Sequence, residues 1–243
     1  MSELLKINNL WGGYQEGVDI LCGISMEVQQ GEAVGIIGLN GSGKSTFGKA
    51  IMNMIPIRKG EILFEGEDIT ALTTSELSHR GISIMQQGGK VFRNLSVWDN
   101  LQLADQGTSA QLAEMIPLLQ RSKKHLQHLM ADKLSGGQKH QLSLAMTLAT
   151  NPRLVILDEP SAGLSPKAVE EMYQILRDVR SKMNVTIILI EQNIAKAIEF
   201  CNVCRLMDMG NSVQSFDKSN TNQIVEILFR KTNKYKQYEK NNY

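Results

Sequence analysis

Residues 38–45 read GLNGSGKS, and this short stretch constrains the fold more than any other part of the chain. It matches the pattern GxxxxGK[ST], follows an apolar run within 32–38, and precedes a segment, 44–53, that we expect to be helical. Glycines let backbone N–H groups curve around phosphate oxygens, and the N-terminus of a helix adds a favourable dipole. A buried strand that enters such a turn predicts an α/β fold with a mainly parallel sheet.

The side chains of this turn suit a nucleoside triphosphate bound with Mg²⁺. Lys44 carries a charge for the β and γ phosphates, and the hydroxyl of Ser45 can bind the metal ion. The alternative is a chance glycine-rich turn, which the flanking strand and helix pattern disfavours. The nucleotide-binding residues that we predict in this turn are Gly38, Leu39, Asn40, Gly41, Ser42, Gly43, Lys44, Ser45 and Thr46.

A second candidate element is the apolar strand 154–157, which ends in Asp158 and Glu159. Ligands bind at the carboxyl ends of the strands in open α/β sheets, so both carboxylates are expected near the phosphates. Asp158 would hold Mg²⁺ directly or through water, and Glu159 would accept a proton from an attacking water. Carboxylates also end strands as solvated caps, but the glycine-rich turn favours the catalytic interpretation.

The third element is LSGGQ at 134–138, which opens an amphipathic helix over 136–150. A serine and two glycines at a helix start can form a second anion-binding site. The plainer interpretation is an ordinary N-cap turn. The residues concerned are Ser135, Gly136, Gly137 and Gln138.

The remaining pattern predicts one domain over 1–243, with no internal repeat. Alternating residues in 4–36 indicate short antiparallel strands, and 87–133 is a mainly helical insertion that, with the helix after LSGGQ, forms a helical subdomain over 87–150. Further strands are predicted at 61–64, 81–85, 185–190 and 203–207, and further helices at 166–181 and 193–200. The predicted fold is therefore a phosphate-binding NTPase core with an N-terminal antiparallel β subdomain and a helical subdomain.

Composition excludes several other classes of protein. The net charge of +1 gives no reason to expect nucleic acid as a partner, and the longest apolar runs are too short to cross a bilayer. Cys201 and Cys204 form a CxxC without a second half, which favours buried apolar residues over a zinc site or redox pair. The tail over 217–243 is basic and is expected to be helical or frayed, with contact to acidic lipid or RNA as the alternative.

The three motifs in this order resemble those of the nucleotide-binding subunits of ABC transporters, over about residues 4–216. The resemblance implies hydrolysis of ATP with Mg²⁺ as cofactor. It also implies two kinds of partner, which are transmembrane permease subunits and a second ABC ATPase subunit that contributes its LSGGQ segment in trans. The expected location is the cytoplasm, peripheral on the inner face of the cell membrane.

The resemblance also assigns roles to single residues. Tyr14 matches the aromatic residue that stacks on adenine, and Gln86, next to a second glutamine, matches the glutamine that contacts Mg²⁺ and the water. Gln192 occupies the position of the switch histidine, so it can donate a hydrogen bond but cannot carry a proton. Ser165 replaces the usual aspartate after the acidic strand. The implied catalytic residues are Glu159, Gln86 and Gln192, and the implied metal ligands are Ser45, Gln86 and Asp158.

The segments Glu191-Gln192-Asn193 and SAGL before Pro166 resemble the ATPases of branched-chain amino-acid and urea or amide uptake systems. The leading prediction is therefore an ATPase that powers amino-acid-type import through separate membrane subunits. One alternative is a single-domain ABC ATPase of the iron–sulfur assembly type, which works without a permease. A nucleotide sensor without turnover is a third reading, and the intact Lys44, Asp158 and Glu159 argue against it.

Overall fold

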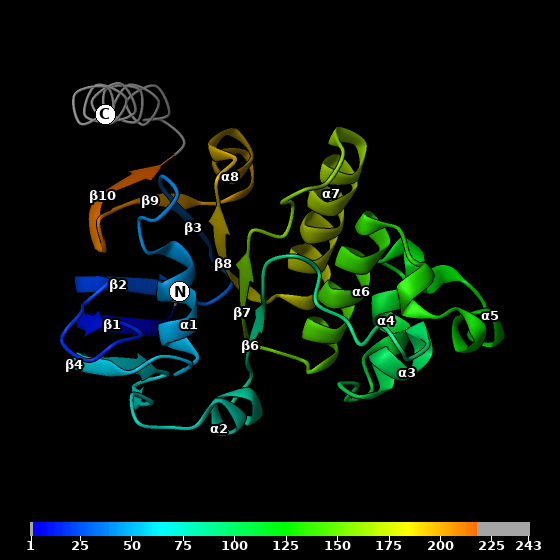
Figure 1. The fold of residues 1–243 in the computed structure, drawn as a ribbon, viewed down its shortest axis with the longest axis horizontal. Coiled ribbons are helices and arrows are strands. Elements are labelled where there is room, and N and C mark those ends of the chain that lie inside the picture. The colour runs from blue at the N-terminus through cyan, green and yellow to red at the C-terminus, as the bar shows by residue number, and fades with distance from the viewer. Residues whose placement is uncertain (1, 218–243) are drawn as a thin grey trace.

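A computed structural model describes residues 2–217, and Figure 1 shows two sheets with helices around them. One sheet contains β1 (Glu3–Gly12), β2 (Leu21–Gln29), β4 (Ile57–Phe64) and β5 (Glu67–Asp68). The other contains β3 (Ala33–Ile37), β6 (Ile82–Met85), β7 (Leu154–Asp158), β8 (Thr186–Glu191), β9 (Val203–Asp208) and β10 (Asn211–Asp217). The strand orders are β2-β1-β4-β5 and β10-β9-β3-β8-β7-β6.

The larger sheet is parallel except for β10, and the smaller sheet is antiparallel. Every residue of β3, β7 and β8 is buried, as expected for central parallel strands covered on both faces. The fold class predicted from the sequence, α/β with a mainly parallel sheet and an N-terminal antiparallel sheet, is confirmed. In particular, β3 and β7 bring the glycine-rich turn and the acidic pair to the same edge of the sheet.

Helix α1 (Lys44–Ile51) lies between the two sheets (Figure 1). A Cβ atom on Gly48 would lie 2.8 Å from Ile190 Cδ1 and 3.2 Å from Ile156 Cγ2, so glycine allows the helix to approach β7 and β8 closely. One apolar core joins α1 to the antiparallel sheet, and a second lies on the opposite side of the parallel sheet. The start of α1 is therefore held rigidly at the end of β3.

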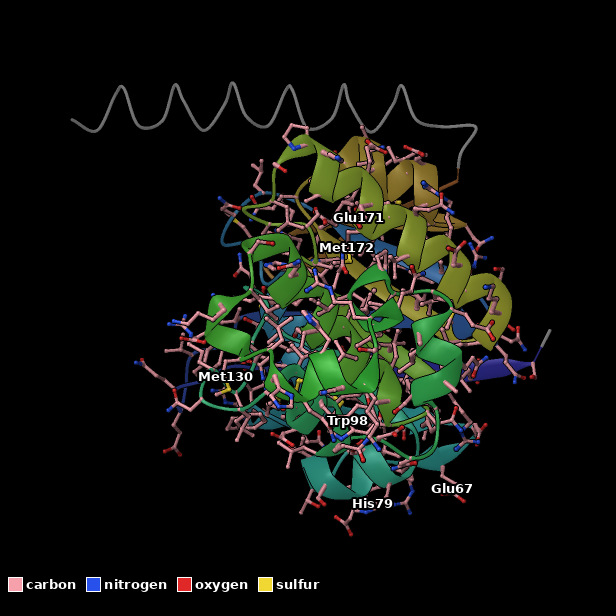
Figure 2. The ribbon with its side chains drawn as sticks, turned by 90° about the vertical axis from the view of Figure 1, so that its right-hand side faces the viewer. Glu67, His79, Trp98, Met130, Glu171 and Met172 are labelled. Carbon is pink, nitrogen blue, oxygen red and sulfur yellow. The ribbon has the colours of Figure 1, made fainter. Side chains whose placement is uncertain are left out.

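The segment between β6 and β7 is helical, but its helices are short. It contains α3 (Val97–Gln102), α4 (Ser109–Ala113), the 3₁₀ turns Pro117–Gln120 and Ala131–Lys133, α5 (Lys123–His128) and α6 (Gly136–Ala149). Figure 2 faces this part of the molecule, where the labelled Trp98 and Met130 lie. Gly107 and Pro117 break the chain into separate turns, which the leucine spacing alone did not reveal.

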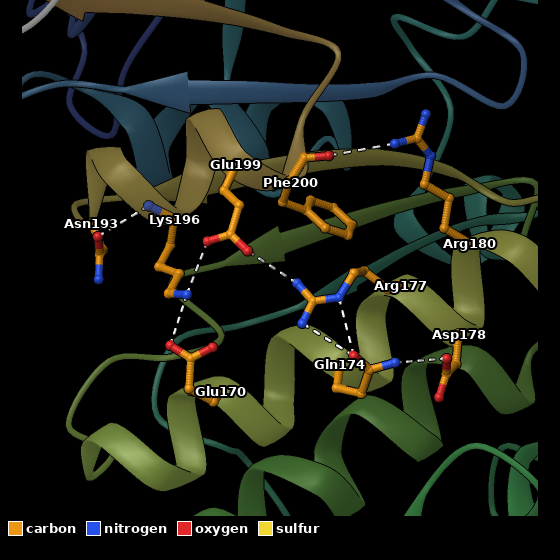
Figure 3. Close-up of polar contacts among 9 residues, drawn as sticks. All are labelled: Glu170, Gln174, Arg177, Asp178, Arg180, Asn193, Lys196, Glu199 and Phe200. Atoms are coloured by element: carbon orange, nitrogen blue, oxygen red, sulfur yellow. Dashed lines mark hydrogen bonds and ion pairs between the residues drawn. The ribbon is translucent and has the colours of Figure 1, made fainter. Parts of the chain in front are cut away.

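Two ion pairs connect the last two helices of the described chain. Helix α7 (Pro166–Met183) and helix α8 (Ile194–Phe200) lie side by side, joined by ion pairs from Lys196 Nζ to Glu170, at 2.7 Å, and from Arg177 to Glu199, at 3.5 Å (Figure 3). These pairs connect the helix that follows β8 to the helix that follows β7.

Three elements were not predicted from the sequence. They are β5, α2 (Thr74–His79) and β10. Strand β10 forms a hairpin with β9 through Met209 and Gly210, which both have positive φ, at 45° and 77°. A Cβ atom on Gly210 would lie 1.9 Å from the carbonyl oxygen of Ile20, so this turn also fits closely against the antiparallel sheet. The sequence signal was the glycine alone.

Two minor expectations can also be compared with the structure. Cys201 and Cys204 are buried, at 1% and 3% exposure, with both sulfur atoms against Gly35, which agrees with their interpretation as buried small residues. The basic tail predicted over 217–243 lies, apart from its first residue, outside the described residues. Within residues 2–217, no helix is both long enough and apolar enough to span a membrane.

Candidate nucleotide site

The glycine-rich turn connects β3 to α1, and its backbone requires glycine. A Cβ atom on Gly38 would lie 2.3 Å from the carbonyl oxygen of Met207. Gly43, the N-cap of α1, has a φ of 99°, and Gly41 has a φ of 78°. Both φ values lie in the region that glycine adopts without strain. The turn therefore has the close, curved backbone that the motif predicted.

Lys44 lies across this turn and is only 5% exposed. Its ammonium group donates to the carbonyl oxygens of Gly38, at 3.0 Å, and Leu39, at 2.8 Å. Burial lowers the pKa of Lys44, while the charges of Glu159, Asp158 and other nearby carboxylates act in the opposite direction. Neutral carbonyls are weaker acceptors for an ammonium than phosphate oxygens, so a bound triphosphate would draw Lys44 away from them.

Ser42 provides an observation that points to a ligand. Its hydroxyl oxygen is buried and has no hydrogen-bond partner in the structure. Buried polar side-chain atoms nearly always have a partner, so this hydroxyl can still donate a hydrogen bond to a bound ligand oxygen. Ser42 also lines a cavity of about 590 Å³ together with residues 38–41 of the same turn and Gln192, Ile194, Asp208 and Met209. The site therefore fits a phosphate group.

Asp158 and Ser45 lie together at the start of α1. The Ser45 hydroxyl donates to Asp158 Oδ1 at 2.9 Å, and Asp158 is 3% exposed. Burial raises the pKa of Asp158, with the charge of Glu159 adding to this effect and the Ser45 hydrogen bond opposing it. A hydroxyl and a carboxylate are the hard oxygen ligands that Mg²⁺ prefers, with phosphate oxygens and water completing its coordination. The donors therefore fit Mg²⁺, and residues 2–217 contain no cluster of three or more acidic, histidine or cysteine residues for another metal.

Glu159 is the first residue after β7 and has a φ of 48°. Its backbone N–H donates to the carbonyl oxygen of Ile190 at 2.9 Å, which fixes its position beside β8. Both carboxylate oxygens accept hydrogen bonds from side-chain amides, one from Gln87 at 2.6 Å and one from Gln192 at 2.5 Å. The glutamine at the switch position thus contacts the predicted catalytic base directly.

The glutamine expected after β6 lies elsewhere than predicted. Gln86 was the expected contact, but the structure places Gln87 beside Glu159. Gln86 instead lines a different cavity, together with Ser78 and Thr147. The turn that begins at Gln87 directs its side chain into the site instead. The two adjacent glutamines left this register open in the sequence.

Tyr14 lies over the first turn of α1 and is 50% exposed. Its hydroxyl is 3.3 Å from Lys49 Nζ and 3.5 Å from the Thr46 hydroxyl, and Lys49 Nζ lies 5.4 Å from the centre of the ring. An exposed aromatic ring next to a phosphate-binding turn can stack on a base. The geometry is therefore compatible with the predicted role of Tyr14.

Within one chain, the LSGGQ segment does not adjoin the cavity at the glycine-rich turn. The Ser135 hydroxyl accepts from the N–H of Gln138 at 3.3 Å, and the Gln138 side chain accepts from the N–H of Ser135 at 3.1 Å, so these residues form a capping box. They line a cavity of about 490 Å³ that shares no residue with the cavity at the glycine-rich turn. The segment is thus an N-cap, as its plainer interpretation predicted, and also borders a separate cavity.

Comparison with known proteins agrees with this geometry. Residues 21–162 match the family described as ABC transporter. The chain is 31% identical to the high-affinity branched-chain amino acid transport ATP-binding protein BraG of Pseudomonas aeruginosa, over 82% of this chain and 87% of BraG. It is 30% identical to the lipopolysaccharide export system ATP-binding protein LptB of Escherichia coli K12, over 86% of this chain and 88% of LptB.

Similarity to a solved structure leads to the same family. A nucleotide-free ATP-binding cassette from an ABC transporter superimposes with a TM-score of 0.81 at 25% identity, covering 92% of this chain and 95% of that one. The chain therefore belongs to the ATP-binding subunits of the ABC transporter family, and it is an ATPase that drives transport.

Proposed function

We propose that this chain powers the import of an amino-acid-type solute through separate transmembrane subunits. The observation that carries the proposal is the hydrogen bond from Gln192 to Glu159, because a glutamine at the switch position is the feature that resembles branched-chain amino-acid uptake ATPases. The likeness to BraG, over most of both chains, supports the same class of solute. In this proposal the chain lies on the cytoplasmic face of the membrane, bound to its permease.

In the proposed mechanism the glycine-rich turn binds the triphosphate of ATP. Lys44 exchanges its two backbone carbonyl contacts for phosphate oxygens, and Tyr14 stacks on the adenine. Ser45 and Asp158 would hold Mg²⁺, which neutralises phosphate charge when bound. Glu159 accepts the proton of the attacking water, and Gln87, in place of Gln86, contacts Mg²⁺ and the water.

The proposal also requires a second ATPase subunit. Because LSGGQ and the glycine-rich turn line separate cavities, one chain cannot place its own Ser135 over its own nucleotide. A head-to-tail pair brings each LSGGQ helix start to the partner's ATP, where the dipole and free N–H groups favour phosphate. The second subunit is a copy of this chain or a related ATPase.

A second candidate solute class is a lipid such as lipopolysaccharide, exported rather than imported. The likeness to LptB, at 30% identity over 86% of this chain, favours it to a similar degree. The iron–sulfur assembly alternative has no support among these relatives.

Uptake measurements in cells that depend on this chain separate the solute classes. Cells with the parent chain should accumulate labelled leucine, whereas cells with Glu159→Gln should not, because the substitution removes the base and leaves the fold intact. Glu114→Gln, an exposed site on α4's C-cap, is the control and should transport normally. Normal leucine uptake with Glu159→Gln, together with loss of lipid export, would replace the amino-acid proposal by the lipid one.

A further inference from the structure

A buried carboxylate next to the site has no role in the mechanism so far. Glu191 is the last residue of β8 and is 2% exposed. One of its oxygens accepts from the Ser161 hydroxyl at 2.6 Å. The other accepts from the backbone N–H groups of Gln192, at 3.0 Å, and Asn193, at 3.2 Å. Burying a carboxylate is costly unless it is hydrogen-bonded, and here both oxygens are satisfied.

These contacts join two segments that both lie next to Glu159: the turn that follows Glu159 in the chain, and the residues that follow β8. Ser161 lies two residues after Glu159, in the turn that leads towards α7. Gln192 follows β8 and donates its side-chain amide to Glu159. Glu191 therefore completes a closed ring of contacts. From Glu159 the backbone leads to Ser161, which donates to Glu191; Glu191 accepts from the backbone N–H of Gln192, and the Gln192 side chain donates back to Glu159.

The residue after Gln192 is also held in place. Asn193 caps α8, where its side chain accepts from the N–H of Lys196 at 3.2 Å, and Lys196 pairs with Glu170 on α7 (Figure 3). Tyr173 of α7 is fully buried beside Glu191, and burial together with the charge of Glu191 raises the pKa of its hydroxyl. The two-residue segment that carries Gln192 is thus held at both ends.

The need for such a support follows from the chemistry of glutamine. An amide can donate to Glu159 only while its nitrogen faces that carboxylate, and Gln192 has three side-chain torsions that free rotation would randomise. Fixing the backbone N–H groups of Gln192 and Asn193 limits where the side chain can reach. Misplacement by about 1 Å at a catalytic contact can cost about 100-fold in rate.

We propose that Glu191 is a positioning residue for ATP hydrolysis, which holds Gln192 against Glu159 and anchors it to Ser161. The inference rests on the proposed roles of Glu159 and Gln192. Glu191 contacts no reacting atom in this proposal, and its carboxylate acts as an acceptor of three hydrogen bonds rather than as a base.

The first test compares three substitutions by ATP turnover. Glu191→Ala should lower kcat by about 10- to 100-fold with KM for ATP close to the parent value, since the hydrogen bonds of Glu191 are to Ser161, Gln192 and Asn193 and not to the glycine-rich turn. Glu191→Gln should recover most of kcat, because its carbonyl oxygen can accept from both N–H groups and its amide can donate to the Ser161 hydroxyl. Ser161→Ala, which removes one contact and no charge, should give a smaller loss of kcat and serves if Glu191→Ala does not fold.

A double-mutant cycle with Gln192→Ala separates a positioning role from a merely structural one. It measures whether the loss of kcat caused by Glu191→Ala depends on the presence of Gln192. If Glu191 acts through Gln192, then Glu191→Ala should cause little further loss of kcat in the Gln192→Ala background, and Ser161→Ala should behave in the same way. Equal losses in both backgrounds would overturn the proposal, as would an unchanged kcat in Glu191→Ala.

The matched control lies at the other end of the same strand. Thr186 is fully buried, and its hydroxyl accepts from the N–H of Gly31 at 2.9 Å. Thr186→Val should lower the melting temperature but leave kcat and the effect of Gln192→Ala unchanged. A failure of the proposed function is recognised separately, since Glu159→Gln would then retain turnover, whatever the Glu191 variants do.

Discussion

The molecule contains two glycine-bearing turns that open helices, one at α1 and one at α6, and they differ in what surrounds them. At α1, Lys44 and the carboxylates Asp158 and Glu159 converge on the turn, and the Ser42 hydroxyl lacks a partner. At α6, the capping box of Ser135 and Gln138 satisfies its own polar groups. We therefore propose that the residues at the first turn carry out hydrolysis, whereas the second turn contributes a helix dipole and an open cavity.

The difference extends to the charge at each cavity. The cavity at the α6 turn is bordered by one basic and one acidic side chain, Arg121 and Glu171, so its lining carries no net charge. At the α1 turn the buried charges are close enough to change one another's pKa. We therefore expect substitutions at α1 to affect binding and chemistry in the single chain, and substitutions at α6 to act only in a pair of chains.

The largest effect is expected for Glu159→Gln. Loss of the base should reduce turnover by about 10²- to 10⁴-fold while ATP affinity, measured by calorimetry, stays near the parent value. Glu114→Gln provides an exposed control of the same chemistry. Turnover at the parent rate in Glu159→Gln would assign the base to another residue.

Gly136→Leu tests the α6 turn with little risk to the fold. A Cβ atom on Gly136 meets no other atom within 4 Å, so the variant should keep its melting temperature and bind ATP normally. In a pair of chains the leucine would fill the space that the partner's nucleotide needs, and turnover should fall by about 10- to 100-fold. Gly136→Ala should give a smaller loss. Parent turnover in Gly136→Leu would remove this turn from the reaction.

Tyr14→Ala should have a moderate effect that is confined to the base. Stacking of an aromatic side chain on a base is worth about 1–3 kcal/mol, so ATP affinity should fall by about 5- to 160-fold. Tyr14→Phe should bind like the parent. Affinity for inorganic triphosphate should not change in either variant, and a matching loss with triphosphate would mean that the tyrosine acts on the turn itself.

The smallest effect concerns stability and pH. Folding raises the pKa of Asp158, because burial disfavours its charged form. The contribution of Asp158 to the free energy of unfolding is therefore fully present at low pH, where the group is protonated. It is lost as pH rises through the raised pKa of the folded chain. At a pH above this raised pKa the buried charge therefore destabilises the nucleotide-free chain, and there Asp158→Asn should raise its melting temperature by about 2–4 °C per kcal/mol relieved. The difference should shrink as pH is lowered. A difference that does not change with pH would refute this explanation.

Much of the site could be predicted from local sequence. The backbone of the glycine-rich turn, the end of β7 and the start of α6 each depend on residues adjacent in the chain. For this reason the fold class and the order of the main strands and helices were predicted and confirmed. The ends of most of these elements lie within two or three residues of their predicted positions.

The features that were missed depend on contacts between distant segments. The choice between Gln86 and Gln87 follows from how one strand end turns, and a single sequence contains no signal for it. In the sequence Glu191 is a polar residue at a strand end, and its hydrogen bond with Ser161, 30 residues away in the chain, is visible only in the structure. Strand β10 was missed because its pairing with β9 rests on a turn with positive φ at Met209, a residue that rarely adopts it.

The most direct test of the account is a crystal structure of Glu159→Gln grown with ATP and Mg²⁺. We expect a triphosphate inside the turn between β3 and α1, with Lys44 Nζ moved from the carbonyl oxygens of Gly38 and Leu39 to phosphate oxygens. A structure with saturating nucleotide in which Lys44 keeps both carbonyl contacts and the turn holds no phosphate would contradict it.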